Sequence, residues 1–103
     1  MDVQINQADG KTTVAFVGSL DTAAAVQCKE DLQPVFDKAS QSIVLDCARM
    51  DYISSSGLRI FISLLKQVTA AGGTLQIINL NSEVRNVFVL TGFAKRFNIA
   101  AKQ

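Results

Sequence analysis

The sequence is organised around residues 42–58, which read SIVLDCARMDYISSSGL. The first part, Ile43-Val44-Leu45, has the composition of a strand that is buried on both faces. Three serines and a glycine follow, and from Leu58 to Val68 the apolar residues recur at the spacing of an amphipathic helix. The stretch therefore predicts a buried strand, a hydroxyl-rich turn and a long helix, in that order.

The serine turn, Ser54-Ser55-Ser56, has two interpretations from the residues alone. Hydroxyls just before a helix accept hydrogen bonds from the free N–H groups of its first turn. The same position lies at the positive end of the helix dipole and favours an anion. The turn is therefore either a helix cap or a site that holds or acquires a phosphate. Gly57 lets the first helical turn approach another backbone.

Two strands are predicted upstream of this stretch. Residues 3–7 begin an alternation of apolar and polar side chains, and residues 12–17 are rich in β-branched residues. Asp9-Gly10 between them is a hairpin signal. We therefore expect two antiparallel strands joined by a tight turn.

A helix is predicted over residues 23–39, with Asp21 or Thr22 as its cap. Pro34 removes a helical hydrogen bond, so we expect it to kink the helix or to split it into two short pieces. The apolar stripe of this helix comprises Ala25, Cys28, Leu32, Val35 or Phe36, and Ala39.

The downstream half continues the alternation of helices and strands. The expected elements are a helix over residues 55–71, a strand over 74–79, a helix over 83–90 capped by Asn81 or Ser82, and a last short strand or turn at Phe97, Ile99 and Ala100. The apolar stripe expected for the first of these helices is Leu58, Phe61, Ile62, Leu65 and Val68, and Gly72-Gly73 ends it.

The resulting order is β-β-α-β-α-β-α with a possible short terminal strand. Because helices precede and follow the buried strand, it should pair in parallel with its neighbours. With 103 residues the chain fits one compact domain. We therefore predict a single α/β domain over residues 1–103, with a mixed β-sheet and its helices packed mainly on one face.

Charge and composition exclude several classes of function. The net charge is +1, and the lysines and arginines are scattered, so we expect no nucleic-acid partner. No segment resembles a signal sequence or reaches the roughly 20 apolar residues of a membrane span, so we expect a cytoplasmic protein without membrane insertion. The chain has no histidine, which excludes Ser-His-Asp and Cys-His nucleophile systems and histidine-bearing metal sites.

Cys28 and Cys47 are isolated in the sequence. We interpret them as small core residues in a reduced compartment, with a disulfide or a metal site as the alternative. No pair of carboxylates stands out near the serines, and Asp51 is the acid closest to them. We therefore expect no metal, no cofactor and no enzymatic activity.

In its whole length the chain resembles a STAS domain of the anti-sigma factor antagonist type. The residues that carry the resemblance are Gly18-x-Leu20-Asp21, Ile43-Val44-Leu45-Asp46, Tyr52-Ile53-Ser54-Ser55-Ser56-Gly57-Leu58, Gly72-Gly73 before Leu75-Gln76-Ile77, and Asn86-Val87-Phe88-x-Leu90-Thr91-Gly92-Phe93. Their order and spacing together make the match.

The resemblance implies a phosphorylation switch. In this family a serine or threonine directly before the glycine is phosphorylated by a partner kinase that is also the anti-sigma factor, and the phosphate abolishes binding to that partner. The matching position here is Ser56, with Ser55 as the second choice. The family pattern has an aspartate two residues before the acceptor, where this chain has Ser54.

The resemblance also implies a partner surface around the acceptor. The expected partner-binding residues are Asp21, Thr22, Ser54, Ser55, Gly57, Arg59 and Ile60. Ser55 is expected to act either as the helix cap or as the secondary acceptor. The partner would be an anti-sigma factor that is a serine-protein kinase, and the protein would be a monomer when free.

Two other functions remain open at this point. The chain could be a stand-alone STAS subunit of a lipid-transport ATPase or of a stressosome-like scaffold that is never phosphorylated, which the missing aspartate at position 54 keeps possible. It could also be a small enzyme that uses Ser56 as a nucleophile, against which the absence of histidine argues.

Overall fold

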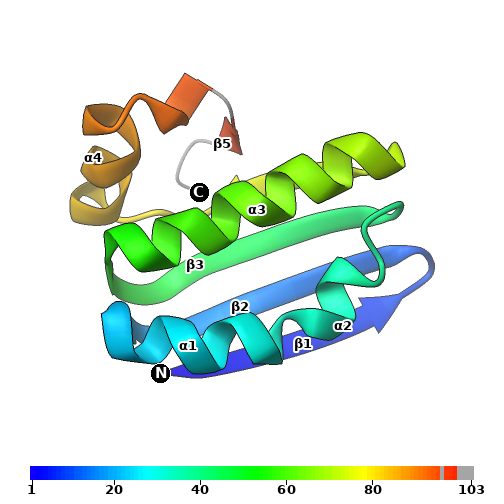
Figure 1. The fold of residues 1–103 in the computed structure, drawn as a ribbon, viewed down its shortest axis with the longest axis horizontal. Coiled ribbons are helices and arrows are strands. Elements are labelled where there is room, and N and C mark those ends of the chain that lie inside the picture. The colour runs from blue at the N-terminus through cyan, green and yellow to red at the C-terminus, as the bar shows by residue number, and fades with distance from the viewer. Residues whose placement is uncertain (96, 100–103) are drawn as a thin grey trace.

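The computed structural model describes residues 1–95 and 97–99, in which five strands form one mixed sheet (Figure 1). The strands are β1 (Asp2–Ala8), β2 (Lys11–Leu20), β3 (Ser42–Ile53), β4 (Thr74–Ile78) and β5 (Asn98–Ile99), and they lie side by side in chain order. β1 and β2 are antiparallel, whereas β3, β4 and β5 each run parallel to the preceding strand. The predicted mixed sheet and short last strand are confirmed. Ala100, predicted as part of the last element, lies outside the described residues.

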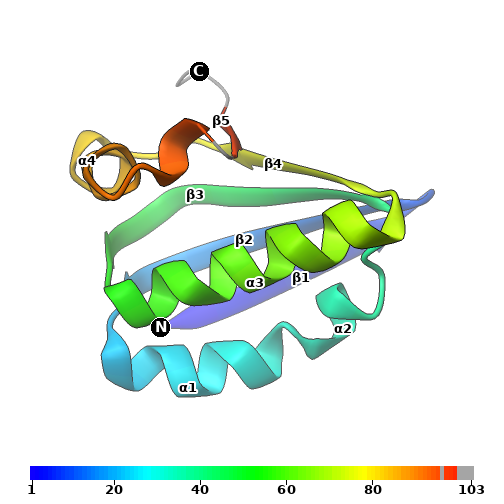
Figure 2. The ribbon, with the colours of Figure 1, turned by 45° about the horizontal axis from the view of Figure 1, so that its top comes forward.

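Helices connect the parallel strands. They are α1 (Thr22–Asp31), α2 (Gln33–Phe36), α3 (Ser55–Ala71) and α4 (Ser82–Leu90), followed by the 3₁₀ turn η1 (Phe93–Lys95). α1, α2 and α3 lie on one face of the sheet, and α4 lies at the end of the sheet near the start of α3 (Figure 1, Figure 2). The predicted order and the packing of the helices mainly on one face are confirmed.

The tight turn between β1 and β2 forms at Asp9 and Gly10, as predicted. Both residues have positive φ angles, 51° and 76°. The flanking residues Ala8 and Lys11 are register partners, so the loop has the two residues of a type I′ hairpin.

Pro34 splits the helix predicted over residues 23–39, as expected. α1 ends at Asp31, and α2 begins at Gln33 with the proline in its first turn. A proline is tolerated there because the first helical N–H groups have no intrahelical acceptor. Val35 rather than Phe36 is the fully buried member of this stripe.

The apolar stripe predicted for α3 is partly wrong. Leu58, Phe61 and Val68 are buried as expected. Ile62 and Leu65, however, are only half-buried, whereas Ile60 and Leu64 are buried instead. The reason is that α1 and α2 pack against α3 and cover the flank that carries Ile60. The sequence of a single helix does not specify such a neighbour.

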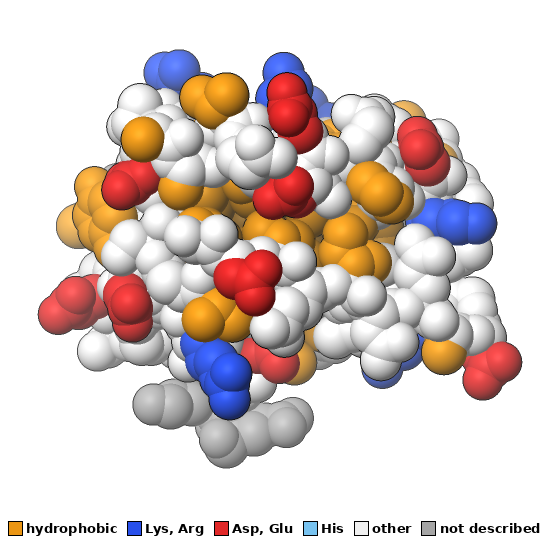
Figure 3. Space-filling view, turned by 90° about the horizontal axis from the view of Figure 1, so that it is seen from below, with side chains coloured by type: hydrophobic (Ala, Val, Ile, Leu, Met, Phe, Trp, Pro, Cys, Tyr) orange, Lys and Arg blue, Asp and Glu red, His pale blue; other side chains and the backbone are white. Residues whose placement is uncertain are grey.

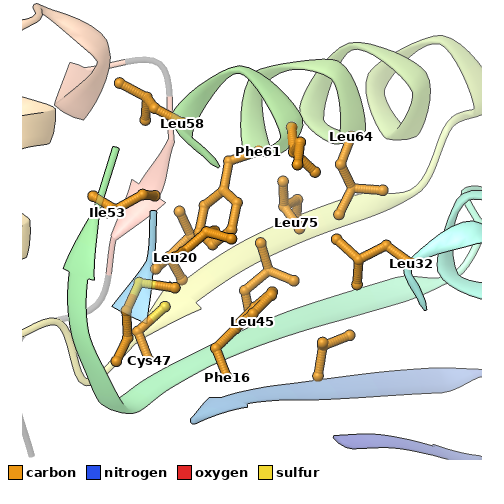
Figure 4. Close-up of a cluster of buried hydrophobic side chains, with 14 of the residues drawn as sticks. Phe16, Leu20, Leu32, Leu45, Cys47, Ile53, Leu58, Phe61, Leu64 and Leu75 are labelled. Atoms are coloured by element: carbon orange, nitrogen blue, oxygen red, sulfur yellow. The ribbon is translucent and has the colours of Figure 1, made fainter. Parts of the chain in front are cut away.

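The core lies between the sheet and α3 (Figure 4). Phe61 of α3 reaches toward Leu20 of β2, and its ring centroid is 5.1 Å from that of Phe16. The ring of Phe88 in α4 is 6.1 Å from Phe61 and 5.4 Å from Phe97. These spacings fall in the range in which aromatic pairs add roughly 0.5–1.5 kcal/mol beyond the burial of their area. The row therefore ties α4 and the segment after η1 to the main core.

Both cysteines are buried and form no disulfide, which agrees with their interpretation as core residues. Burial, together with the smaller effect of the nearby Asp31 carboxylate, raises the pKa of the Cys28 thiol to about 11. Burial, and to a smaller extent the Asp46 carboxylate, raises the pKa of the Cys47 thiol still further above its ordinary value. Neither thiol is a thiolate at neutral pH, so neither is nucleophilic.

The border of the core is partly uncovered on the side where α1 and β1 lie. Figure 3 views the molecule from this side, and apolar side chains gather there in a hollow with acidic side chains along its borders. Val3 and Ile5 of β1 are half-buried and pack against the core. Among the described residues no helix is both long and apolar enough to span a membrane.

Candidate functional site

The N-terminal ends of α1 and α3 are neighbours because the strands that precede them end side by side. Leu20, the last residue of β2, is the register partner of Ile53, the last residue of β3. The N–H group of Ser54 donates to the carbonyl oxygen of Leu20 over 2.8 Å. Ligands of α/β proteins bind outside this carboxyl edge of parallel strands. The predicted site residues around Asp21 and the serine turn therefore meet at the edge where function is expected.

Each of these two helices is capped by a side chain. The Asp21 carboxylate accepts a hydrogen bond from the N–H of Ala24 over 2.8 Å at the start of α1. The Ser54 hydroxyl accepts one from the N–H of Gly57 over 3.1 Å at the start of α3. Of the two roles expected for Ser55, that of the cap is therefore wrong, and that of secondary acceptor stays a prediction. A serine caps a helix about as well as an aspartate, so Ser54 retains the capping role at the place where the family pattern has a carboxylate.

The three serines of the turn occupy different environments. Ser54 is only 6% exposed and its hydroxyl is engaged in the cap. Ser55 is exposed, and Ser56 is half-buried. Among the described residues neither Ser55 nor Ser56 has a side-chain hydrogen bond, so their hydroxyls are available. Accessibility alone excludes Ser54 as an acceptor and leaves the other two.

Gly57 permits the first turn of α3 to lie directly on the strand ends. A Cβ atom at this position would stand 2.6 Å from Cγ of Leu20 and 3.1 Å from Cγ1 of Ile53. Both neighbours are core residues with almost no exposed surface. The sequence predicted an approach to another backbone, which is wrong, because the nearest atoms belong to buried side chains. This contact fixes which helical position each serine occupies.

A groove of about 330 Å³ runs between α1 and α3, and Ser56 lines it whereas Ser55 does not. The wall is mainly apolar and is formed by Ala25, Val26, Phe36 and Ile60. Thr22 and Ser56 contribute hydroxyls, and Lys29 and Arg59 contribute positive charges. The groove is therefore an apolar surface with hydroxyl and cationic groups beside it.

Each helix presents one face to this groove, at intervals of three and four residues. The residues of α3 are Ser56, Arg59, Ile60 and Ser63, and those of α1 are Thr22, Ala25, Val26 and Lys29. Residues at these spacings are neighbours on a helix surface. The structure thus brings together four predicted site residues: Thr22, Ser56, Arg59 and Ile60. Asp21 caps α1 next to the groove. Ser54 and Gly57 are buried at the start of α3.

Sequence reasoning did not assign Val26 or Lys29 of this surface to the site, nor the exposed Tyr52 that lies outside the groove. Lys29 and Val26 line the groove, and Val26 is 72% exposed, which is unusual for a large apolar side chain. Tyr52, just before the serine turn, is 51% exposed. The interval of seven residues between Thr22 and Lys29 was the available signal, because it places both on one helical face. Exposed apolar side chains near a groove are a feature of protein interaction surfaces.

The site has neither metal ligands nor a catalytic arrangement among the residues that the structure describes. No group of three or more cysteine or carboxylate side chains is placed to hold a metal ion there. Among the residues that line the groove, no carboxylate stands beside Ser56 to act as its general base. What the arrangement offers is a surface for docking and a hydroxyl for modification.

Comparisons with known proteins agree in fold and in family. Residues 2–102 match the STAS domain family. The chain is 35% identical over 100 residues to BtrV of Bordetella bronchiseptica, provisionally named an anti-sigma factor antagonist, covering 97% of this chain and 86% of that protein. It is 27% identical to the anti-sigma-B factor antagonist of Bacillus subtilis, covering 99% and 93%.

The solved structures that resemble this fold include one protein in two states. The unphosphorylated form of the anti-sigma factor antagonist SpoIIAA superimposes with a TM-score of 0.78 at 20% identity, covering 97% of this chain and 89% of that chain. The phosphorylated form of SpoIIAA from Bacillus gives a TM-score of 0.72 at 19% identity, covering 97% and 92%. Both forms therefore share the fold described above.

Proposed function

The chain belongs to the STAS domain family, and we propose that it acts as an anti-sigma factor antagonist controlled by phosphorylation of Ser56. In this proposal the unphosphorylated protein, a cytoplasmic monomer, binds an anti-sigma factor that is also a serine-protein kinase. Phosphorylation by that kinase ends the binding. The names of BtrV and of the Bacillus subtilis relative support the regulatory role.

The observation that carries the choice of Ser56 is its position among the three serines. Its hydroxyl is unengaged among the described residues, and it alone of the three lines the groove between α1 and α3. In the proposed reaction its Oγ attacks the γ-phosphorus of ATP, ADP leaves, and the hydroxyl proton passes to a base on the kinase. The antagonist supplies the nucleophile and the kinase supplies the catalytic groups, which fits a chain that has no histidine.

A phosphate at this position can switch binding without unfolding the domain. It adds about 1.5 to 2 negative charges and three acceptor oxygens. Because Ser56 lies in the first turn of α3, the helix dipole favours that charge. A partner that docks across the groove must instead desolvate the phosphate or approach it with its own charges, at a cost of several kcal/mol. Folding is thus preserved while docking is lost.

The test is reconstitution with the cognate kinase and ATP. We expect one phosphate per wild-type chain, located at Ser56 by mass spectrometry, and none on Ser56→Ala. The matched control Ser55→Ala should accept phosphate as the wild type does, because Ser55 neither caps the helix nor lines the groove. Complete transfer to Ser56→Ala would refute the assignment.

Binding is tested with the same proteins. The kinase should be retained by wild type and by Ser56→Ala, and lost when phosphoserine occupies position 56. Equal retention of all three would favour the alternative role, a STAS subunit of a lipid-transport ATPase or of a scaffold. Partner contacts of Asp21, Thr22, Ser55, Arg59 and Ile60 are part of the proposal. Those of Ser54 and Gly57 stay predictions, because both residues are buried and, unlike the buried Ile60, neither lines the groove.

A further inference from the structure

Two positive charges beside the proposed acceptor have no counter-charge. Lys29 from α1 and Arg59 from α3 line the same groove as Ser56. Among the residues that the structure describes, neither has a hydrogen bond or an ion pair, and no carboxylate lines the groove. Asp21 and Asp51 lie in the flanking segments, and neither is a lining residue. Both side chains are exposed, and an anion in the groove would accept charge-assisted hydrogen bonds from them.

Arg59 and Lys29 line the groove from the two helices that form it. Arg59 follows Ser56 by three residues on α3, a spacing that brings side chains within about 5–6 Å at their Cβ atoms. Lys29 stands across the groove on α1, on the helical face that it shares with Thr22 and Val26. A phosphate on Ser56 would therefore have a guanidinium, which binds phosphate through paired N–H groups, one turn along α3, and an ammonium across the groove, about two turns along α1 from Thr22.

We propose that the groove between α1 and α3 is an intramolecular receptor for the phosphate of Ser56, with Lys29 and Arg59 as its ligands. This inference rests on the proposed function only in taking Ser56 as the modified residue. In the phosphorylated protein the two ion pairs link α1 to α3 and the phosphate covers the apolar wall. The switch thus removes the docking surface itself, in addition to placing a charge near the partner.

The test is a phosphorus NMR titration of protein carrying phosphoserine at position 56, installed during translation so that no kinase is needed. Free phosphoserine has a second pKa of about 6. Nearby positive charges favour the dianion, so we expect a pKa lower by about 0.5 or more in the folded protein than in the same protein unfolded in urea. Lys29→Gln and Arg59→Gln should each restore part of the difference, and the double variant most of it.

Two matched controls separate the receptor from other causes. Lys66→Gln removes an exposed cation of α3 that does not line the groove, and it should leave the titration unchanged. Phosphoserine at position 55 experiences the same helix end but lies outside the groove, so Lys29→Gln should have little effect on it, whereas Arg59, four residues along the same helix, is a neighbour of both positions. Circular dichroism of each variant verifies that the fold is intact.

The outcomes distinguish this inference from the proposed function. An identical phosphate pKa in the wild type and the double variant overturns the receptor, even if a kinase modifies Ser56. If Lys29→Gln shifts the pKa of a phosphate at position 55 as much as that of a phosphate at position 56, the receptor is overturned as well. Conversely, if the kinase modifies another residue, the proposed function fails while a lowered pKa at position 56 still supports the receptor.

Discussion

Replacing Gly57 with alanine tests whether the first turn of α3 packs as closely against the ends of β2 and β3 as the structure indicates. The new Cβ atom would stand 2.6 Å and 2.8 Å from Cγ and Cδ2 of Leu20. Leu20 has no exposed surface, so it cannot turn away into solvent. Overpacking of this kind costs about 1–3 kcal/mol. Alanine recovers at most about 1 kcal/mol through its better helix propensity. We expect a net loss of about 1–2 kcal/mol.

The assay is urea unfolding followed by circular dichroism, with the midpoint and the slope fitted separately. The slope should not change, because the surface exposed on unfolding is the same. In a domain of about 100 residues, 1 kcal/mol corresponds to roughly 4–8 °C in melting temperature, which gives an independent measurement. The exposed position Ser55 provides the control, since Ser55→Ala should stay within about 0.5 kcal/mol of wild type.

A double-mutant cycle with Leu20→Ala identifies the clashing partner. Leu20→Ala alone removes buried atoms and should cost about 2–5 kcal/mol. In that background Cγ and Cδ2 are absent, so Gly57→Ala should be neutral or stabilising. The coupling free energy should therefore be about 1–3 kcal/mol. If Gly57→Ala is equally harmless in both backgrounds, the close approach has no energetic consequence and the reasoning is refuted.

Three further predictions concern the cap, the core and the buried thiols. Ser54→Ala should lower the free energy of unfolding by about 1 kcal/mol because Gly57 loses its hydrogen-bond acceptor, and urea unfolding beside Ser55→Ala measures it; equal stability of the two variants would contradict the cap. Phe88→Ala should cost about 3–5 kcal/mol because Phe88 is fully buried between Phe61 and Phe97, and calorimetry that finds less than about 1 kcal/mol would contradict the aromatic row. Cys28 has a folded-state pKa of about 11, above the ordinary value near 9, so the unfolded chain loses this proton first and stability should fall as pH rises from about 9 to 11. The urea midpoint, measured against pH, should therefore fall less steeply in Cys28→Ala than in the wild type. An equally steep fall in both proteins would contradict the contribution of Cys28.

The strands and helices were predictable because local patterns determine them. The apolar run at residues 43–45, the Asp9-Gly10 turn and the proline at position 34 act through backbone geometry that neighbouring residues impose. The buried face of α3 was predicted less well because α1 and α2 decide which flank is covered. Ile60 has the same local pattern around it whether or not another helix packs there.

The residues of the candidate site likewise fall into those that the sequence predicted and those that depend on how the helices pack. A serine turn before a helix and its resemblance to the family identified the region and named Ser56. Lys29 was missed because its proximity to Ser56 exists only after α1 packs against α3. The roles of three identical serines could not be assigned either, since they differ only in helical position. That position is set by the contact of Gly57 with Leu20, which lies 37 residues earlier in the chain.

The separation of the cap from the acceptor explains how the proposed switch leaves the fold intact. If Ser54 carried the phosphate, α3 would lose the hydroxyl that accepts from Gly57, and a dianion would be placed where only 6% of the residue is exposed. At Ser56 the phosphate disturbs no hydrogen bond among the described residues and lies in the groove that Lys29 and Arg59 also line. Ser54 and Ser56 are only two positions apart, but their side chains face different surroundings because each helical residue turns the side chain by about 100° around the helix axis. Adjacent hydroxyls can therefore serve folding and signalling without interfering with each other, provided that Gly57 holds the helix at this rotation.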